Sequence, residues 1–231
     1  MTHHHPHDEK HSEVVKGEKT SYWRRYKIKY PPRRRGISMF LVTLLILAGI
    51  TALIVWLVYR PNEPKFRVVS AAVYDLNTTT PPFLFANMQF TLITRNPNKR
   101  VSFYYDRLSA FVSYRNQAIT PPTMLPPLYQ ETKSTVALSP VLGGAGVPVP
   151  VSPEVSNGLG MDEAYGAVPL RLILTGRIKY KAGSIRTDHH DIYVECDMLV
   201  GLKKGFTAGP VPLLGVGVGV GSPPIDCKVD A

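Results

Sequence analysis

Cysteine is scarce in this chain, and familiar catalytic motifs are absent. Two cysteines among 231 residues are too few for a disulfide-dense miniprotein or a four-cysteine zinc module. The sequence contains no H-E-x-x-H, G-x-S-x-G or G-x-x-x-x-G-K-[ST] pattern. We therefore expect no catalytic, cofactor-binding or metal-binding residues and no enzymatic activity. An exported hydrolase is the weaker alternative. It would depend on His189 and His190, which as neighbours in a strand would point to opposite faces.

The composition favours a folded protein of many short elements. Hydrophobic residues make up 44% of the chain and charged residues 19%, which excludes a wholly disordered protein. The 21 prolines and 18 glycines argue against a helical bundle, because both residue types interrupt helices.

Basic residues are concentrated at the N-terminus. Residues 1–35 hold ten Lys or Arg and four Asp or Glu, so they carry +6 of the net charge of +10. They lack an apolar period, and we expect a disordered, basic cytosolic tail. Its cations either only set the membrane topology or also contact anionic lipid headgroups; nucleic acid is not an expected partner. The cations closest to the apolar run are Arg24, Arg25, Lys27, Lys29, Arg33, Arg34 and Arg35.

An uncharged, apolar run follows at residues 37–58. At about 1.5 Å per residue it makes a helix of roughly 33 Å, enough to cross a hydrocarbon core of about 30 Å. We predict a transmembrane helix over residues 36–59. Because more cations precede the run than follow it, the N-terminus is expected in the cytosol and residues 60–231 outside. Small residues within the run also allow a homo-oligomer.

The remaining residues alternate apolar and polar side chains with a period of two, which is typical of strands with one buried face. Turn-forming clusters separate these rows, and no long helical pattern intervenes. The fold class predicted for residues 60–231 is therefore all-β, a single antiparallel β-sandwich with one short helical turn at residues 152–159. The expected inward rows are Phe66, Val68, Ala72 and Tyr74; Met88, Phe90 and Leu92; Leu108, Ala110, Val112 and Tyr114; Leu170, Leu172, Leu174, Ile178 and Tyr180; and Ile192, Val194, Cys196, Met198 and Val200.

Two covalent modifications are expected on the exported side. Oxidising conditions there favour a disulfide between Cys196 and Cys227 over two buried free thiols. Asn77-Thr78-Thr79 is an N-glycosylation acceptor in an expected loop.

Two segments carry a family resemblance. LIVWLVYRPNEPKFRV at residues 53–68 and RNPNKRVSFYYDRL at residues 95–108 resemble the plant NHL proteins, the harpin-induced and non-race-specific disease-resistance-like group of the late-embryogenesis-abundant group 2 superfamily. The resemblance extends to CDMLVGLKKG and CKVDA near the C-terminus. Its motif residues are Asn96, Pro97, Asn98, Tyr104, Tyr105 and Asp106, for which we expect a turn followed by core and corner contacts.

The resemblance implies a fibronectin type III-like sandwich on a single-pass plasma-membrane protein that acts in plant defence and stress responses without a catalytic centre. A protein partner or the cell wall is expected at its outer face. The alternative is a lipid-interacting or lipid-transfer protein, which would need an apolar cavity of roughly several hundred Å³.

Overall fold

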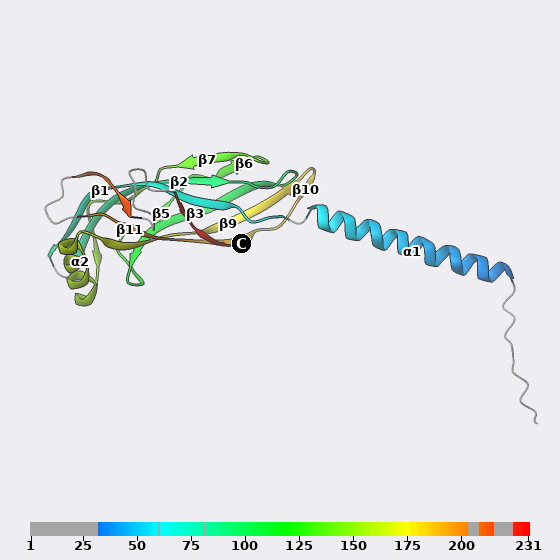
Figure 1. Ribbon diagram of the computed structural model, residues 1–231, viewed down its shortest axis with the longest axis horizontal. Helices are drawn as coiled ribbons and strands as arrows, with labels where there is room; N and C mark the ends of the chain where they lie inside the picture. The colour runs from blue at the N-terminus through cyan, green and yellow to red at the C-terminus, as the bar shows by residue number, and fades with distance from the viewer. Residues whose placement is uncertain (1–31, 60, 81, 203–207, 215–223) are drawn as a thin grey trace, which may run out of the picture. The chain divides into compact units, whose positions relative to one another are not determined.

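A computed structural model describes residues 32–59, 61–80, 82–202, 208–214 and 224–231 (Figure 1). The chain divides into two compact units, Met1–Ala52 and Leu53–Ala231. The helices are α1 (Pro32–Tyr59) and α2 (Pro153–Tyr165). The strands are β1 (Lys65–Thr80), β2 (Phe83–Arg95), β3 (Ser102–Tyr114), β4 (Gln117–Ala118), β5 (Thr123–Met124), β6 (Leu128–Gln130), β7 (Thr135–Leu138), β8 (Val141–Pro150), β9 (Val168–Ala182), β10 (Ile185–Arg186), β11 (His190–Val200), β12 (Gly209–Val211), β13 (Leu213–Leu214), β14 (Ile225–Asp226) and β15 (Lys228–Asp230).

Helix α1 contains the predicted span. Its apolar stretch Gly36–Leu57 is long enough to cross a membrane. We expected residues 1–35 to form a disordered tail. The helix begins at Pro32, so residues 32–35 are helical instead. Proline is well suited to the first turn of a helix because its missing N–H has no partner there, and the arginines that follow are good helix formers. The rest of the predicted tail, residues 1–31, lies outside the described residues.

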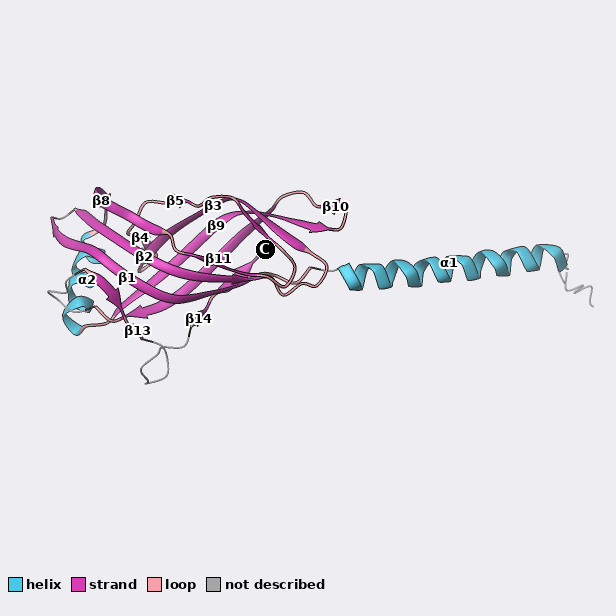
Figure 2. Ribbon diagram, turned by 90° about the horizontal axis from the view of Figure 1, so that it is seen from above, coloured by secondary structure: helices cyan, strands magenta, loops and turns pink. Residues whose placement is uncertain are grey.

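The sandwich consists of two antiparallel sheets, which confirms the predicted fold class. The six-stranded sheet has the order β12-β1-β2-β7, with β14 also paired to β1 and β8 to β2. The nine-stranded sheet has the order β13-β11-β9-β3-β4; β10 also pairs with β9, β15 with β11, and β5 and β6 with β3. Figure 2 shows the long strands of the two layers crossing at an angle, as twisted sheets do when they pack face to face.

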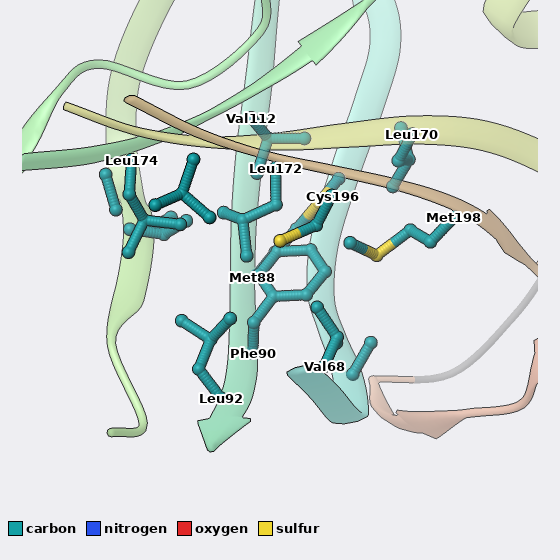
Figure 3. Packing of buried hydrophobic residues seen from close by; sticks show 14 of the residues in the cluster. Val68, Met88, Phe90, Leu92, Val112, Leu170, Leu172, Leu174, Cys196 and Met198 are labelled. Atoms are coloured by element: carbon teal, nitrogen blue, oxygen red, sulfur yellow. The ribbon is translucent and has the colours of Figure 1, made fainter. Parts of the chain in front are cut away.

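The core lies between the sheets, where the period-two rows predicted for β2, β3, β9 and β11 are buried as expected. Phe90 and Met88 of one sheet face Leu172 and Cys196 of the other (Figure 3). The row predicted for β1 is correct only at its start. After Phe66 and Val68, the inward residues are Ala71 and Val73 instead of Ala72 and Tyr74.

A β-bulge causes this change in β1. Val68 pairs with Leu92 but Ser70 pairs with Thr91, so one extra residue enters the strand and the side chains that follow, up to the next register shift after Val73, turn to the other face. Tyr74 therefore points outward, where its hydroxyl donates a hydrogen bond to Gln89 Oε1 at 2.7 Å.

Helix α2 lies at the end of the sandwich opposite the β9–β10 hairpin (Figure 1). Ser152 caps it as predicted, with its Oγ accepting a hydrogen bond from the Val155 N–H at 3.3 Å. The helix continues to Tyr165, beyond the single turn expected at residues 152–159. Gly166 ends it in the left-handed conformation at φ 86°.

Candidate functional site

The asparagines of the family motif form a buried corner of the sandwich. Asn96 Nδ2 donates to the carbonyls of Val101 at 2.8 Å and Glu131 at 2.9 Å. Asn96 Oδ1 accepts from the backbone N–H of Asn98 at 2.9 Å and from Asn98 Nδ2 at 3.1 Å. Every hydrogen-bonding position of this buried amide group therefore has a partner, which fixes the turn around Pro97.

The same corner holds the segment that follows α1. Asn98 Nδ2 donates to the carbonyl of Asn62 at 2.8 Å, and Asn98 Oδ1 accepts from the Asn62 N–H at 2.8 Å. Asn62 is three positions after Tyr59, the last residue of α1. These two hydrogen bonds, made by the Asn98 side chain to the backbone of Asn62, hold the chain that follows α1 against the motif turn.

Tyr105 extends this network into the core. Its side chain is buried, and its hydroxyl donates to Gln130 Oε1 at 3.1 Å and lies 3.4 Å from Thr94 Oγ1. Gln130 Nε2 donates in turn to the Thr94 carbonyl at 2.9 Å. Burial raises the pKa of Tyr105 above its usual range, so the phenol stays neutral and remains a donor. We call Asn62, Thr94, Asn96, Asn98, Tyr105 and Gln130 the motif corner.

Gln130 and Asn62 were not singled out from the sequence. Gln130 lies on β6, far from the motif along the chain, and no local pattern marks it. Asn62 directly follows Pro61 and lies two residues before Pro64. This context is typical of turns and could have marked Asn62 as a turn residue.

Tyr104 and Asp106 do not lie in the core. Tyr104 is 37% exposed, because it alternates on β3 with the buried Phe103 and Tyr105. The expected core or corner role is therefore correct for Tyr105 and wrong for Tyr104. Asp106 is half-buried, and its Oδ2 lies 3.4 Å from His189 Nε2.

The two adjacent histidines have different neighbours, as expected for successive residues. His189 contacts Asp106, whereas the His190 ring packs against Tyr180 with 5.6 Å between the ring centroids. Among the described residues, no group of three or more His, Cys, Asp or Glu side chains is arranged to hold a metal ion. The two histidines therefore do not converge on one substrate position.

Cys196 and Cys227 form a disulfide in the structure, with their Cα atoms 4.3 Å apart. Cys196 is buried on β11 of the nine-stranded sheet. Cys227 lies where the chain leaves β14 in the six-stranded sheet and enters β15 in the other, and its N–H donates to the Phe66 carbonyl at 3.0 Å. The bridge thus fastens this crossing between the sheets to the core.

The other expected contact residues are placed as follows. Asn77 is exposed near the end of β1, paired across the ladder with Phe85, so it is in a strand and not in a loop. Arg33, Arg34 and Arg35 belong to the first turns of α1. The remaining cations of the tail, Arg24, Arg25, Lys27 and Lys29, lie outside the described residues.

Comparisons with known proteins identify the family. Residues 91–198 match the family described as Late embryogenesis abundant protein, LEA_2. The chain is 36% identical over 164 residues to NDR1/HIN1-like protein 1 of Arabidopsis thaliana, covering 70% of this chain and 78% of that protein. The protein belongs to the NDR1/HIN1-like family. It is also 35% identical over 162 residues to Arabidopsis NDR1/HIN1-like protein 12, covering 70% of this chain and 76% of the relative. The family resemblance predicted from the motifs is therefore confirmed. The LEA_2 match covers β9, most of β11 and every residue of the motif corner except Asn62.

Proposed function

We propose that this NDR1/HIN1-like protein is a non-enzymatic, single-pass protein of the plasma membrane that acts in plant defence and stress responses. In this proposal α1 is the anchor, the N-terminal tail is cytosolic, and the β-sandwich is presented to the cell exterior. The tail is short and carries no catalytic motif, so a signal passes through a protein partner or the cell wall at the outer face.

The Cys196–Cys227 bridge is the observation that carries the proposal. Disulfides persist in oxidising compartments and are rare in the cytosol. An apolar helix preceded by cations and followed by a disulfide-bonded sandwich is the order expected for an N-in, C-out protein. The exposed acceptor Asn77 on the same side of the helix agrees with this orientation.

Lipid transfer is the second candidate, and the packing of the core argues against it. A lipid carrier needs an apolar cavity of roughly several hundred Å³. Large buried side chains from both sheets, including Phe66, Phe90 and Tyr105, occupy the space between the layers. The rings of Phe66 and Tyr105 meet edge to face across the sheets with 6.0 Å between their centroids.

Genetic loss and complementation test the role. Plants that lack the protein should support more pathogen growth, and the full chain should restore resistance. A matched chain that ends after the anchor should reach the membrane without restoring resistance. Equal pathogen growth and stress tolerance with and without the protein would refute the defence role, and rescue by the truncated chain would refute the role of the sandwich.

A further inference from the structure

A concave site lies beside the outward-facing Tyr104 on the nine-stranded sheet. It has a volume of about 520 Å³, within the range of about 300–1,000 Å³ typical of ligand pockets. Its side chains come from β3, β6, β9 and β10; those of β3, β6 and β10 are exposed, and the two lysines of β9 are half-buried. We call it the tyrosine–cation pocket and define it by Tyr104, Tyr129, Lys179, Lys181 and Arg186.

The strand register brings these residues together from distant parts of the chain. Tyr104 is paired with Tyr129 on one side and with Lys179 on the other, so the three side chains form one row across the sheet. Lys181 and Arg186 are paired in the β9–β10 hairpin, two residues further along β9. Two residues span about 7 Å along a strand, so a row of rings lies next to a row of cations on one face.

The two tyrosine rings form an accessible shelf. Tyr104 is 37% exposed and Tyr129 is 46% exposed, although both are large and partly apolar. Lys181 Nζ lies 5.9 Å from the centroid of the Tyr129 ring, within cation–π distance. Exposed tyrosines beside cations are characteristic of binding surfaces, because each ring offers a flat apolar face as well as a polar hydroxyl.

The pocket carries three cations, and the charge of Glu63 acts on Tyr180 in its lining without forming an ion pair with any of them. Among the described residues, no Asp or Glu oxygen lies within 4.0 Å of the charged groups of Lys179, Lys181 or Arg186. By contrast, Arg171 elsewhere on the same sheet pairs with both Glu195 and Asp197. The three cations of the pocket are therefore available to an anionic ligand.

The hairpin that presents Arg186 is held in place by one backbone hydrogen bond and one hydrogen bond to a side chain. The Thr187 N–H donates to the Tyr180 carbonyl at 2.9 Å, and the Tyr180 N–H donates to Thr187 Oγ1 at 3.0 Å. Tyr180 is itself buried against Phe103, with 5.5 Å between ring centroids. The pocket is thus built on the packed core, and little ordering is required when a ligand binds.

We propose that the tyrosine–cation pocket binds an acidic polysaccharide composed of uronic acid units. A pyranose ring has an apolar face of C–H bonds that packs on the tyrosine shelf, and its carboxylate accepts hydrogen bonds from Lys181 and Arg186. Inorganic phosphate would use the cations but leave both rings without a contact. The inference rests on the proposed export of the sandwich, because such polymers are found in the wall outside the cell.

Calorimetric titration of the full chain in neutral detergent micelles tests the pocket directly. The probe is an oligomer of galacturonic acid, and the reference ligand is a neutral galactose oligomer of equal length. We expect the acidic oligomer to bind more tightly, with an affinity that falls as salt is added. The paired variant Lys181→Gln with Arg186→Gln should weaken binding about tenfold, since two charge-assisted contacts are lost.

Matched variants separate the pocket from general surface charge. Lys228→Gln removes an exposed cation of β15 outside the pocket, and Tyr193→Ala removes an exposed tyrosine of β11; neither should alter the affinity. Tyr104→Ala should weaken binding of the acidic oligomer. If a double variant unfolds, Arg186→Gln alone remains informative, because Arg186 is exposed at the tip of the hairpin.

Three outcomes would overturn the proposal. They are no preference for the acidic oligomer, equal losses in the pocket and control variants, and tighter binding of soluble glycerophosphoinositol, which would assign the pocket to a lipid headgroup. The titration measures binding to the pocket whichever side of the membrane the sandwich occupies. Failure of the proposed export would instead appear in a protease-accessibility assay, with the binding result unchanged.

Discussion

Replacing Asn96 with alanine removes four hydrogen bonds from the motif corner. The amide donates to the carbonyls of Val101 and Glu131 and accepts twice from Asn98. Each intramolecular hydrogen bond contributes about 0.5–1.5 kcal/mol, and a buried group left without its partner costs about 1–3 kcal/mol. Because Asn96 is fully buried, water does not readily replace the lost contacts. We expect Asn96→Ala to lower the free energy of unfolding by about 3–4 kcal/mol.

The assay is thermal and urea unfolding of the full chain in micelles, followed by circular dichroism of the β-sheet. For a domain of this size, about 3–4 kcal/mol corresponds to a fall in Tm of roughly 6–16 °C. Gln89→Ala is the matched control, since the amide of Gln89 makes its hydrogen bonds at the surface. It should cost less than about 0.5 kcal/mol. Equal, small losses in both variants would refute the reasoning that the motif asparagines act by satisfying a buried corner.

Three further perturbations have defined outcomes. Replacing both Cys196 and Cys227 with alanine should lower the free energy of unfolding by roughly 3–4 kcal/mol, because the bridge closes a loop of sequence separation 31; an unchanged urea midpoint would contradict this. Burial and the hydrogen bond to Asp162 raise the pKa of Tyr114 from about 10 to about 12. The neutral phenol therefore stabilises the folded state fully below pH 10, and this contribution is lost as pH rises through 12. The free energy of unfolding of Tyr114→Phe should fall less between pH 10 and pH 12 than that of the unsubstituted protein. An equal fall in both proteins would exclude Tyr114 as the source of the decline. Asn77→Gln should increase gel mobility to that of enzymatically deglycosylated protein, whereas identical mobility of the untreated proteins would show that the acceptor is unused.

The sequence was most informative where the hydrophobic period was uninterrupted. Rows such as Met88, Phe90 and Leu92 fix which face of a strand is buried, because side chains alternate strictly along an extended backbone. These rows were sufficient to predict a sandwich. In β1 the prediction failed after Val68, since the inserted bulge residue reverses the alternation without leaving a distinct local pattern.

Helix α2 shows a second limit. Ser152 and Pro153 predict where the helix begins, because capping is a local interaction. Gly158 and Gly160 then suggest an early end, as glycine disfavours helix interiors. Leu159 is fully buried, and this tertiary contact favours continuing the helix despite the low local propensity.

The candidate site was predicted only in part, for a topological reason. The motif asparagines could be assigned to a turn from residue type, and the outward position of Tyr104 follows once its strand neighbours are known to be buried. Tyr129, Lys181 and Arg186 join Tyr104 only through the pairing of β3 with β6 and β9, and of β9 with β10. No spacing within a single segment reveals a pocket assembled by strand register.

Protease treatment of intact protoplasts tests the central claim most directly. The full chain would carry one epitope tag before the tail and another after Ala231. Presentation of the sandwich outside the cell predicts that added protease removes the C-terminal tag while the N-terminal tag survives until detergent is added. Survival of the C-terminal tag in intact protoplasts, with its loss only after lysis, would contradict the account.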